Sequence, residues 1–100
     1  MRFGLKEETI KAINSVFASY PQIEKAVIFG SRAKGNYREG SDIDICLFGN
    51  IDFVLLQNIE ISLDALNLPY TIDLVVYDNI QNDELKEHVE RVGVSFNITY

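Results

Sequence analysis

Two aspartates separated by one residue, Asp42 and Asp44, carry the clearest chemical signal in the sequence. They open a short β-favouring run, and side chains at positions i and i+2 of a strand point to the same face, about 6–7 Å apart along the backbone. Two ionised carboxylates at that spacing repel each other and are costly to bury unless they share a cation. Carboxylate oxygens favour hard ions, so the pair predicts a site for Mg²⁺ or Mn²⁺.

A glycine-bearing loop precedes this pair and has the composition of a phosphate site. Gly30 and Ser31 follow an apolar run, where backbone N–H groups and a hydroxyl can approach phosphate oxygens, especially if a short helix begins just after them. Three basic residues, Arg32, Lys34 and Arg38, follow at once, although the whole chain has a net charge of −6. Such a local reversal of charge favours a polyphosphate ligand.

Two common phosphate and metal motifs do not fit this segment. Gly30 and Gly35 have the spacing of a Walker A loop, but Asn36 and Tyr37 stand where that loop needs a lysine and a serine or threonine. An EF-hand loop opening at the same aspartates would lack its central glycine, which Leu47 replaces, and its final glutamate. Both interpretations are therefore excluded.

The elements that must position these residues follow from apolar spacing and from capping residues. The predicted order is helix, strand, strand, helix, strand, helix, strand. We expect an α/β (α+β) fold, with a mixed sheet and helices packed on one side of it, as a single domain over residues 1–100. The predicted elements are a helix over Lys6–Ser19, strands over Lys25–Phe29 and Asp44–Phe48, a helix from the cap Asp52 up to Pro69, a strand over Tyr70–Tyr77, a helix from the cap Asn82 to the C′ residue Gly93, and a strand over Val94–Tyr100.

Several residues outside the central segment have side chains capable of chemistry. Asp73 lies within the third predicted strand, on the face opposite to its alternate apolar residues. Tyr70 and Tyr77 are candidates for stacking on a base, although aromatic strand residues usually belong to the core. His88 has no second histidine or cysteine near it in the sequence and is interpreted as a surface residue. Cys46 lies in an apolar run and is interpreted as a core residue.

Length and composition limit the class of protein. One hundred residues, 47% hydrophobic and 24% charged, make one globular domain. The net charge of −6 argues against direct binding to nucleic acid. The N-terminal residues do not form a signal peptide, no stretch approaches the about 18 apolar residues of a membrane span, and one cysteine suits a reducing compartment. We therefore expect a cytoplasmic protein.

The central segment resembles a known superfamily. Gly30-Ser31, ten intervening positions and Asp42-Ile43-Asp44 form the pattern GSx10DxD of the nucleotidyltransferases that include DNA polymerase β. The forms Gly-Ser-Arg-Ala-Lys-Gly and Ser-Asp-Ile-Asp-Ile are similar to those of the minimal nucleotidyltransferases in that superfamily. The resemblance extends through the leading helix, the mid-chain helix and the strand Tyr-Thr-Ile-Asp-Leu-Val-Val. It implies a polymerase β-like catalytic core.

The resemblance also implies roles for the matching residues. Asp42 and Asp44 match the paired metal ligands, and Asp73 matches the third carboxylate of a site for two Mg²⁺ ions, or Mn²⁺ in their place. Asp73 is also a candidate base for the acceptor hydroxyl. The candidate residues for binding ATP are Gly30, Ser31, Arg32 and Arg38. The implied reaction is attack of an acceptor hydroxyl on the α-phosphorus, with pyrophosphate leaving.

The implied acceptor is a protein. The chain resembles antitoxins of type VII-like toxin–antitoxin pairs, which transfer AMP from ATP to a tyrosine of a HEPN-domain toxin. Relatives that modify antibiotics or nucleic acids generally append a domain for the acceptor, and 100 residues leave no room for one. We therefore expect a separate HEPN-domain partner, and the acidic composition suits a basic one. Two alternatives stay open: transfer to a small-molecule hydroxyl, and an antitoxin that neutralises its partner by binding alone.

Overall fold

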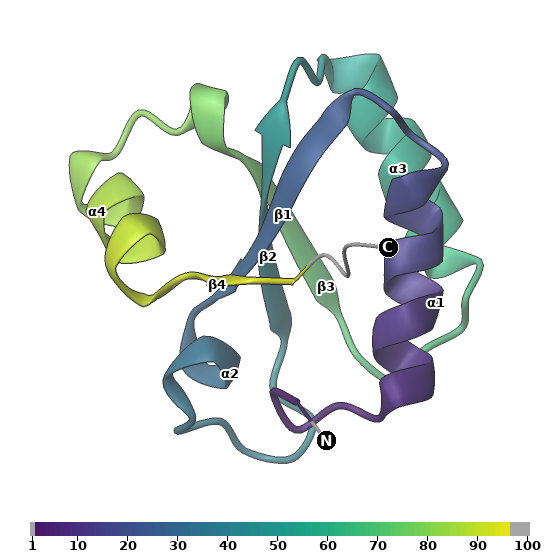
Figure 1. Cartoon of the computed structure of the whole chain (residues 1–100), viewed down its shortest axis with the longest axis vertical. Coiled ribbons are helices and arrows are strands. Elements are labelled where there is room, and N and C mark those ends of the chain that lie inside the picture. The colour runs from purple at the N-terminus through teal and green to yellow at the C-terminus, as the bar shows by residue number, and fades with distance from the viewer. Residues whose placement is uncertain (1, 97–100) are drawn as a thin grey trace.

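The structure is a computed structural model that describes residues 2–96 as a mixed sheet with helices around it (Figure 1). The elements appear in the predicted order, with a short helix added after the first strand and a 3-10 turn after the third. They are α1 Glu7–Ala18, β1 Ile23–Phe29, α2 Ser31–Lys34, β2 Ile43–Gly49, α3 Phe53–Asp64, β3 Ile72–Val76, η1 Tyr77–Asn79, α4 Asp83–Val92 and β4 Val94–Ser95. Within residues 2–96, none of the helices has the length and apolar composition needed to cross a membrane.

The sheet has four strands in the order β3-β2-β1-β4. β1 is antiparallel to β2 and to β4, whereas β2 and β3 are parallel. A parallel pair needs a crossover connection, and α3 supplies it. The C-terminal end of β1 and the N-terminal ends of β2 and β3 therefore meet at one end of the sheet.

The main core lies between the sheet and the two helices α1 and α3, which cover the same face (Figure 1). The alternate residues Ala26 and Ile28 of β1 and Ile43, Ile45 and Leu47 of β2 point into it and are completely buried. This packing requires Asp42 and Asp44 to face away from the core, because side chains alternate along a strand.

The expectation that all helices pack on one side of the sheet is wrong for α4. A second apolar cluster on the opposite face contains Val27, Phe29, Cys46 and, from α4, Val89. β1 is apolar on both faces over its last four residues, so leaving one face uncovered would expose large side chains to water. α4 covers that face, and it therefore lies on the same side of the sheet as Asp44 of β2.

The predicted helix caps Asp52 and Asn82 are confirmed, whereas α3 ends earlier than expected. Asp52 accepts a hydrogen bond from the Leu55 N–H at 2.8 Å and begins α3, but α3 ends at Asp64, before Pro69. Asn82 caps α4 through the N–H groups of its first turn. Gly93 follows α4 with φ −64°, so it does not supply a left-handed residue.

The last strand is also shorter within the described residues than the prediction of Val94–Tyr100. β4 pairs with β1 over Val94 and Ser95, and Phe96 is buried in the main core. Residues 97–100 of that prediction lie outside the described residues.

Candidate active site

The three predicted carboxylates gather where β2 and β3 begin. Asp42 comes just before β2, Asp44 is the second residue of β2, and Asp73 is the second residue of β3. Asp44 and Asp73 are register partners on these parallel strands. Neighbouring strands lie about 4.8 Å apart, so paired residues carry their side chains next to each other on one face. Residues 29 positions apart in the sequence thus form one acidic site.

The glycine of the Gly-Ser pair contacts this site directly. Phe29, the last residue of β1, pairs with Asp44, and the chain then turns at Gly30 with φ +73° and ψ −155°. A Cβ atom at Gly30 would collide with Oδ2 of Asp44. Glycine is therefore required at position 30 for two reasons. This conformation is almost restricted to glycine, and the carboxylate of Asp44 occupies the space that a side chain would need.

The electrostatics of the site are those of crowded carboxylates. Partial burial raises the pKa of Asp44, and the charges of Asp73 and then Asp42 raise it further. The nearby His88 acts in the opposite direction. A cation placed among these carboxylates would remove the repulsion that raises the pKa of Asp44.

The donor set fits a hard divalent cation. Asp42, Asp44 and Asp73 offer carboxylate oxygens, the ligands that Mg²⁺ and Mn²⁺ prefer. Within residues 2–96, no three acidic, histidine or cysteine side chains are already close enough to form a complete metal cage. Asp42, Asp44 and Asp73 are the residues of this site that would hold such an ion.

The loop between β1 and β2 holds the predicted phosphate-binding residues. Ser31 begins α2 and is half-buried, whereas Lys34 and Arg38 are exposed. The N–H of Gly35 donates to the Ser31 carbonyl at 2.9 Å, and the N–H of Arg38 donates to Oγ of Ser41 at 2.9 Å. The loop is thus folded back on itself, with basic side chains on its outer surface.

Arg32 differs from the other basic residues of this loop. It is only 3% exposed, and its guanidinium donates to the Ser41 carbonyl from Nε at 3.0 Å and from Nη2 at 2.9 Å. Nη1 donates to the Phe3 carbonyl at 2.8 Å. The rings of Tyr37 and Tyr70 flank the guanidinium carbon, at 5.1 and 4.9 Å from their centroids. Arg32 was expected to bind ATP, but its donors are directed at backbone carbonyls that hold the loop.

The structure adds one residue that the sequence analysis placed on the surface. His88 is half-buried on α4, with its ring edge-to-face on Phe29 at a centroid distance of 6.1 Å. It is also near enough to Asp44 to affect the pKa of that carboxyl. The signal was its position three residues after Leu85, on the apolar side of the helix.

The remaining candidates have structural partners. The Tyr77 ring stacks on Phe48 with centroids 4.6 Å apart, and its hydroxyl donates to Glu90. Tyr70 packs on Arg32. Cys46 is completely buried, as predicted, and burial raises the pKa of its thiol to about 11.

Solved structures share this fold. A chain in a crystal structure of a toxin–antitoxin with AMP-PNP superposes with a TM-score of 0.70 and 24% identity, over 95% of this chain and 75% of that one. A chain of the tri-AMPylated Shewanella oneidensis HEPN toxin in complex with MNT antitoxin gives a TM-score of 0.68 and 20% identity, over 95% and 74%. The predicted minimal nucleotidyltransferase fold is confirmed.

Sequence comparison identifies the family. The chain is 44% identical over 50 residues to "Putative protein adenylyltransferase MJ0604" of Methanocaldococcus jannaschii, a match that covers 48% of this chain and only half of that relative's length. The profile of the family described as "Polymerase beta, Nucleotidyltransferase" matches residues 11–96. This range contains the Gly-Ser pair and all three carboxylates, and the chain belongs to the polymerase beta nucleotidyltransferase family.

Proposed function

We propose that this chain is a cytoplasmic, Mg²⁺-dependent adenylyltransferase that transfers AMP from ATP to a tyrosine hydroxyl of a HEPN-domain toxin, and so acts as its antitoxin. Membership of the family supports nucleotidyl transfer. The relative named as a protein adenylyltransferase supports AMP as the group and protein as the acceptor. The toxin–antitoxin complexes of the same fold, one with AMP-PNP and one with an AMPylated HEPN toxin, support ATP and this class of partner.

One observation carries the proposal: Asp44 lies beside Asp73 on the neighbouring strand and against the backbone of Gly30. A carboxylate pair would then lie beside a turn that leaves its backbone open to phosphate. A structural protein gains nothing from placing ionised carboxylates together, since their repulsion is unfavourable without a cation. A nucleotidyl transfer site needs this arrangement, because the triphosphate and the carboxylates must share the same metal ions.

The residues of the chain have separate tasks in this proposal. Asp42, Asp44 and Asp73 would hold Mg²⁺, which supplies charge neutralisation and a fixed position for the α-phosphate. Gly30 and Ser31 would bind the outer phosphates, and the exposed side chain of Arg38 would add positive charge there. Arg32 is proposed as a positioning residue, because it holds the carbonyl of the residue just before Asp42.

The chemical step is a substitution at phosphorus. The acceptor oxygen forms a bond to the α-phosphorus, the bond from that phosphorus to the bridging oxygen breaks, and pyrophosphate leaves. The proton of the acceptor hydroxyl passes to a base, and Asp73 is the proposed one because it lies at the edge strand of the sheet, beside Asp44.

The test follows a radioactive label from ATP to the acceptor. The chain is incubated with Mg²⁺, a HEPN-domain protein of the same genome, and ATP labelled at the α- or the γ-phosphate. We expect label on the HEPN protein from α-labelled ATP alone, on a tyrosine located by mass spectrometry. Asp44→Asn should abolish transfer, whereas Glu39→Gln, an exposed acid of the neighbouring loop, should not.

Three outcomes would contradict the proposal. Transfer of γ-label would indicate a kinase, and label on a small molecule in place of protein would indicate the other acceptor class. Inhibition of the toxin by the Asp44→Asn variant as strong as by wild type, with no label transferred, would indicate an antitoxin that acts by binding.

A further inference from the structure

The outward side of α3 exposes large apolar side chains. Phe53, Val54 and Ile61 are 71%, 63% and 65% exposed, and together with Gln57 they form what we call the α3 outer face. Positions 53, 57 and 61 are four residues apart and so follow one side of the helix. Soluble monomers rarely leave such residues together in water, and contiguous exposed apolar surface usually marks an interface.

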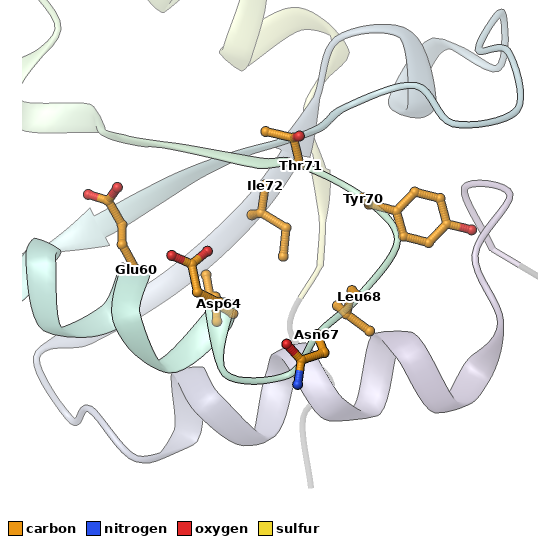
Figure 2. Close-up of a pocket in the computed structure, with 8 residues that line it drawn as sticks. Glu60, Asp64, Asn67, Leu68, Tyr70, Thr71 and Ile72 are labelled. Carbon is orange, nitrogen blue, oxygen red and sulfur yellow. The ribbon is translucent and has the colours of Figure 1, made fainter.

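The surface beside these residues is hollowed and acidic. A hollow of about 340 Å³ lies between α3 and the segment leading into β3, and Glu60, Asp64, Tyr70 and Thr71 are among its lining residues (Figure 2). Figure 2 shows the carboxylates of Glu60 and Asp64 rising from the same side of α3 towards β3. The same two acids also line a second, more open depression that includes Phe53 and Ile61. The apolar residues and the acids thus form one continuous surface.

The charged side chains between Arg38 and Lys86 are all negative. No lysine, arginine or histidine occurs between Arg38 and Lys86, whereas ten of the fifteen acidic residues do. A partner that covers the α3 outer face therefore meets the carboxylates of Glu60 and Asp64 beside Phe53 and Ile61. Its complement is an apolar surface with lysine or arginine at the rim.

A second copy of this chain does not fit the same requirement. In a two-fold symmetric dimer the same patch lies on both sides of the interface. Glu60 and Asp64 of one copy would then face acids of the other, and no basic residue of α3 is available to separate them. Juxtaposed like charges oppose such pairing, so a different protein with a basic surface fits better.

The position of this surface relates it to the active site. β3 is an edge strand that pairs with β2 alone within the described residues. Thr71 and Ile72 line the hollow, and the next residue is Asp73, whose side chain points to the other face of the strand. A protein seated on the α3 outer face and over the hollow would therefore lie beside the segment that leads directly into Asp73.

We propose that the α3 outer face, with the acidic hollow beside it, docks the protein that carries the acceptor hydroxyl. The partner would cover Phe53 and Ile61 with apolar side chains and place a lysine or arginine against Glu60 and Asp64. This inference rests on the proposed function for the identity of the acceptor protein, and it adds which surface of the chain recognises it.

The test measures binding without chemistry. A HEPN-domain protein of the same genome is titrated calorimetrically with the chain in the absence of ATP and Mg²⁺. We expect Phe53→Ser combined with Ile61→Ser to weaken binding at least about 30-fold, the size typical of central interface residues. Val94→Ser is the matched control, because it changes an exposed apolar residue on the opposite edge of the sheet and should leave the affinity unchanged.

The acidic part of the surface is tested separately. Glu60→Lys combined with Asp64→Lys should weaken binding and reduce the salt dependence of the affinity.

Three results of these measurements would overturn the inference. It fails if the serine variants bind as wild type does, or if the HEPN protein does not bind wild type. It also fails if sedimentation equilibrium shows a dimer of the chain that the same serine variants dissociate, because a second copy then covers the surface. AMP transfer is measured in parallel: binding without transfer contradicts the proposed function alone, and transfer with unaltered affinity of the serine variants contradicts the docking surface alone.

Discussion

The backbone of Gly30 lies against the carboxylate of Asp44, so the Gly-Ser and Asp-x-Asp parts of the motif form one site in space. Gly30→Ala should displace that carboxylate and lower AMP transfer about 100-fold, the effect typical of a misplacement of about 1 Å. Alanine would also be strained in the backbone conformation of residue 30, so the variant should lose about 1–3 kcal/mol of the free energy of unfolding. Kinetics and urea denaturation measure the two effects.

Gly35 provides the matched control for this change. It also has a positive φ, +88°, but a Cβ atom there would meet no atom within 4 Å. Gly35→Ala should therefore lower stability by about 1–2 kcal/mol and leave transfer near the wild-type rate. Equal loss of transfer in both variants would show that loop strain, and not contact with Asp44, explains the effect.

Arg32→Lys should destabilise the chain, because lysine cannot donate from three nitrogens to the carbonyls of Ser41 and Phe3. We expect the free energy of unfolding to fall by about 2–4 kcal/mol, and hydrogen exchange to rise over residues 36–42. The exposed Arg38 should behave in the opposite way: Arg38→Gln should raise the KM for ATP and leave stability within about 0.5 kcal/mol. A stable Arg32→Lys variant with only a raised KM would identify Arg32 as a phosphate ligand.

Asp44→Asn should raise the melting temperature at pH 7 in the absence of Mg²⁺. A carboxyl whose pKa is higher in the folded state than in the unfolded state stabilises the fold below its unfolded pKa, and this contribution is lost as pH rises through the folded pKa. The ionised group therefore opposes folding at neutral pH, and the neutral amide removes that effect. Melting curves from pH 3 to pH 8 should show a difference from wild type that vanishes at the acidic end.

Mg²⁺ should make the wild-type protein melt at a higher temperature than the Asp44→Asn variant. It should raise the melting temperature of wild type, because the ion binds the folded state alone, and should have little effect on Asp44→Asn. The Glu39→Gln variant should respond to Mg²⁺ as wild type does. Equal responses of the wild-type and Asp44→Asn proteins would show that the ion binds elsewhere.

Cys46 should resist alkylation in the folded protein. Burial raises the pKa of its thiol to about 11, so at pH 8 only about one thiol in a thousand would be ionised, even before its lack of exposure is considered. Iodoacetamide should therefore react with it in urea and not in buffer, as followed by mass spectrometry. Rapid reaction in buffer would mean that β2 opens easily.

Much of the fold follows from local patterns. The spacing of Ile10, Ile13 and Phe17 predicts α1, and Asp52 and Asn82 mark the starts of two helices, because helix periodicity and capping depend on neighbouring residues. The prediction that all helices pack on one side of the sheet was wrong for α4, because an apolar stripe does not specify which face of a sheet it covers. That choice depends on the alternate residues of β1, which are apolar on both faces.

The candidate site divides in the same way. The sequence by itself determined which residues bear the chemistry, since residue type and spacing identify Gly30, Ser31, Asp42 and Asp44 as a phosphate and metal motif. Only the tertiary structure decided that Asp73 pairs with Asp44 and that His88 lies near Asp44, because these relationships join residues far apart in the chain. It also decided the role of Arg32, whose partners Phe3 and Ser41 come together only once the sheet has formed. A charge in a loop sequence does not reveal whether it meets water, phosphate or carbonyl oxygens.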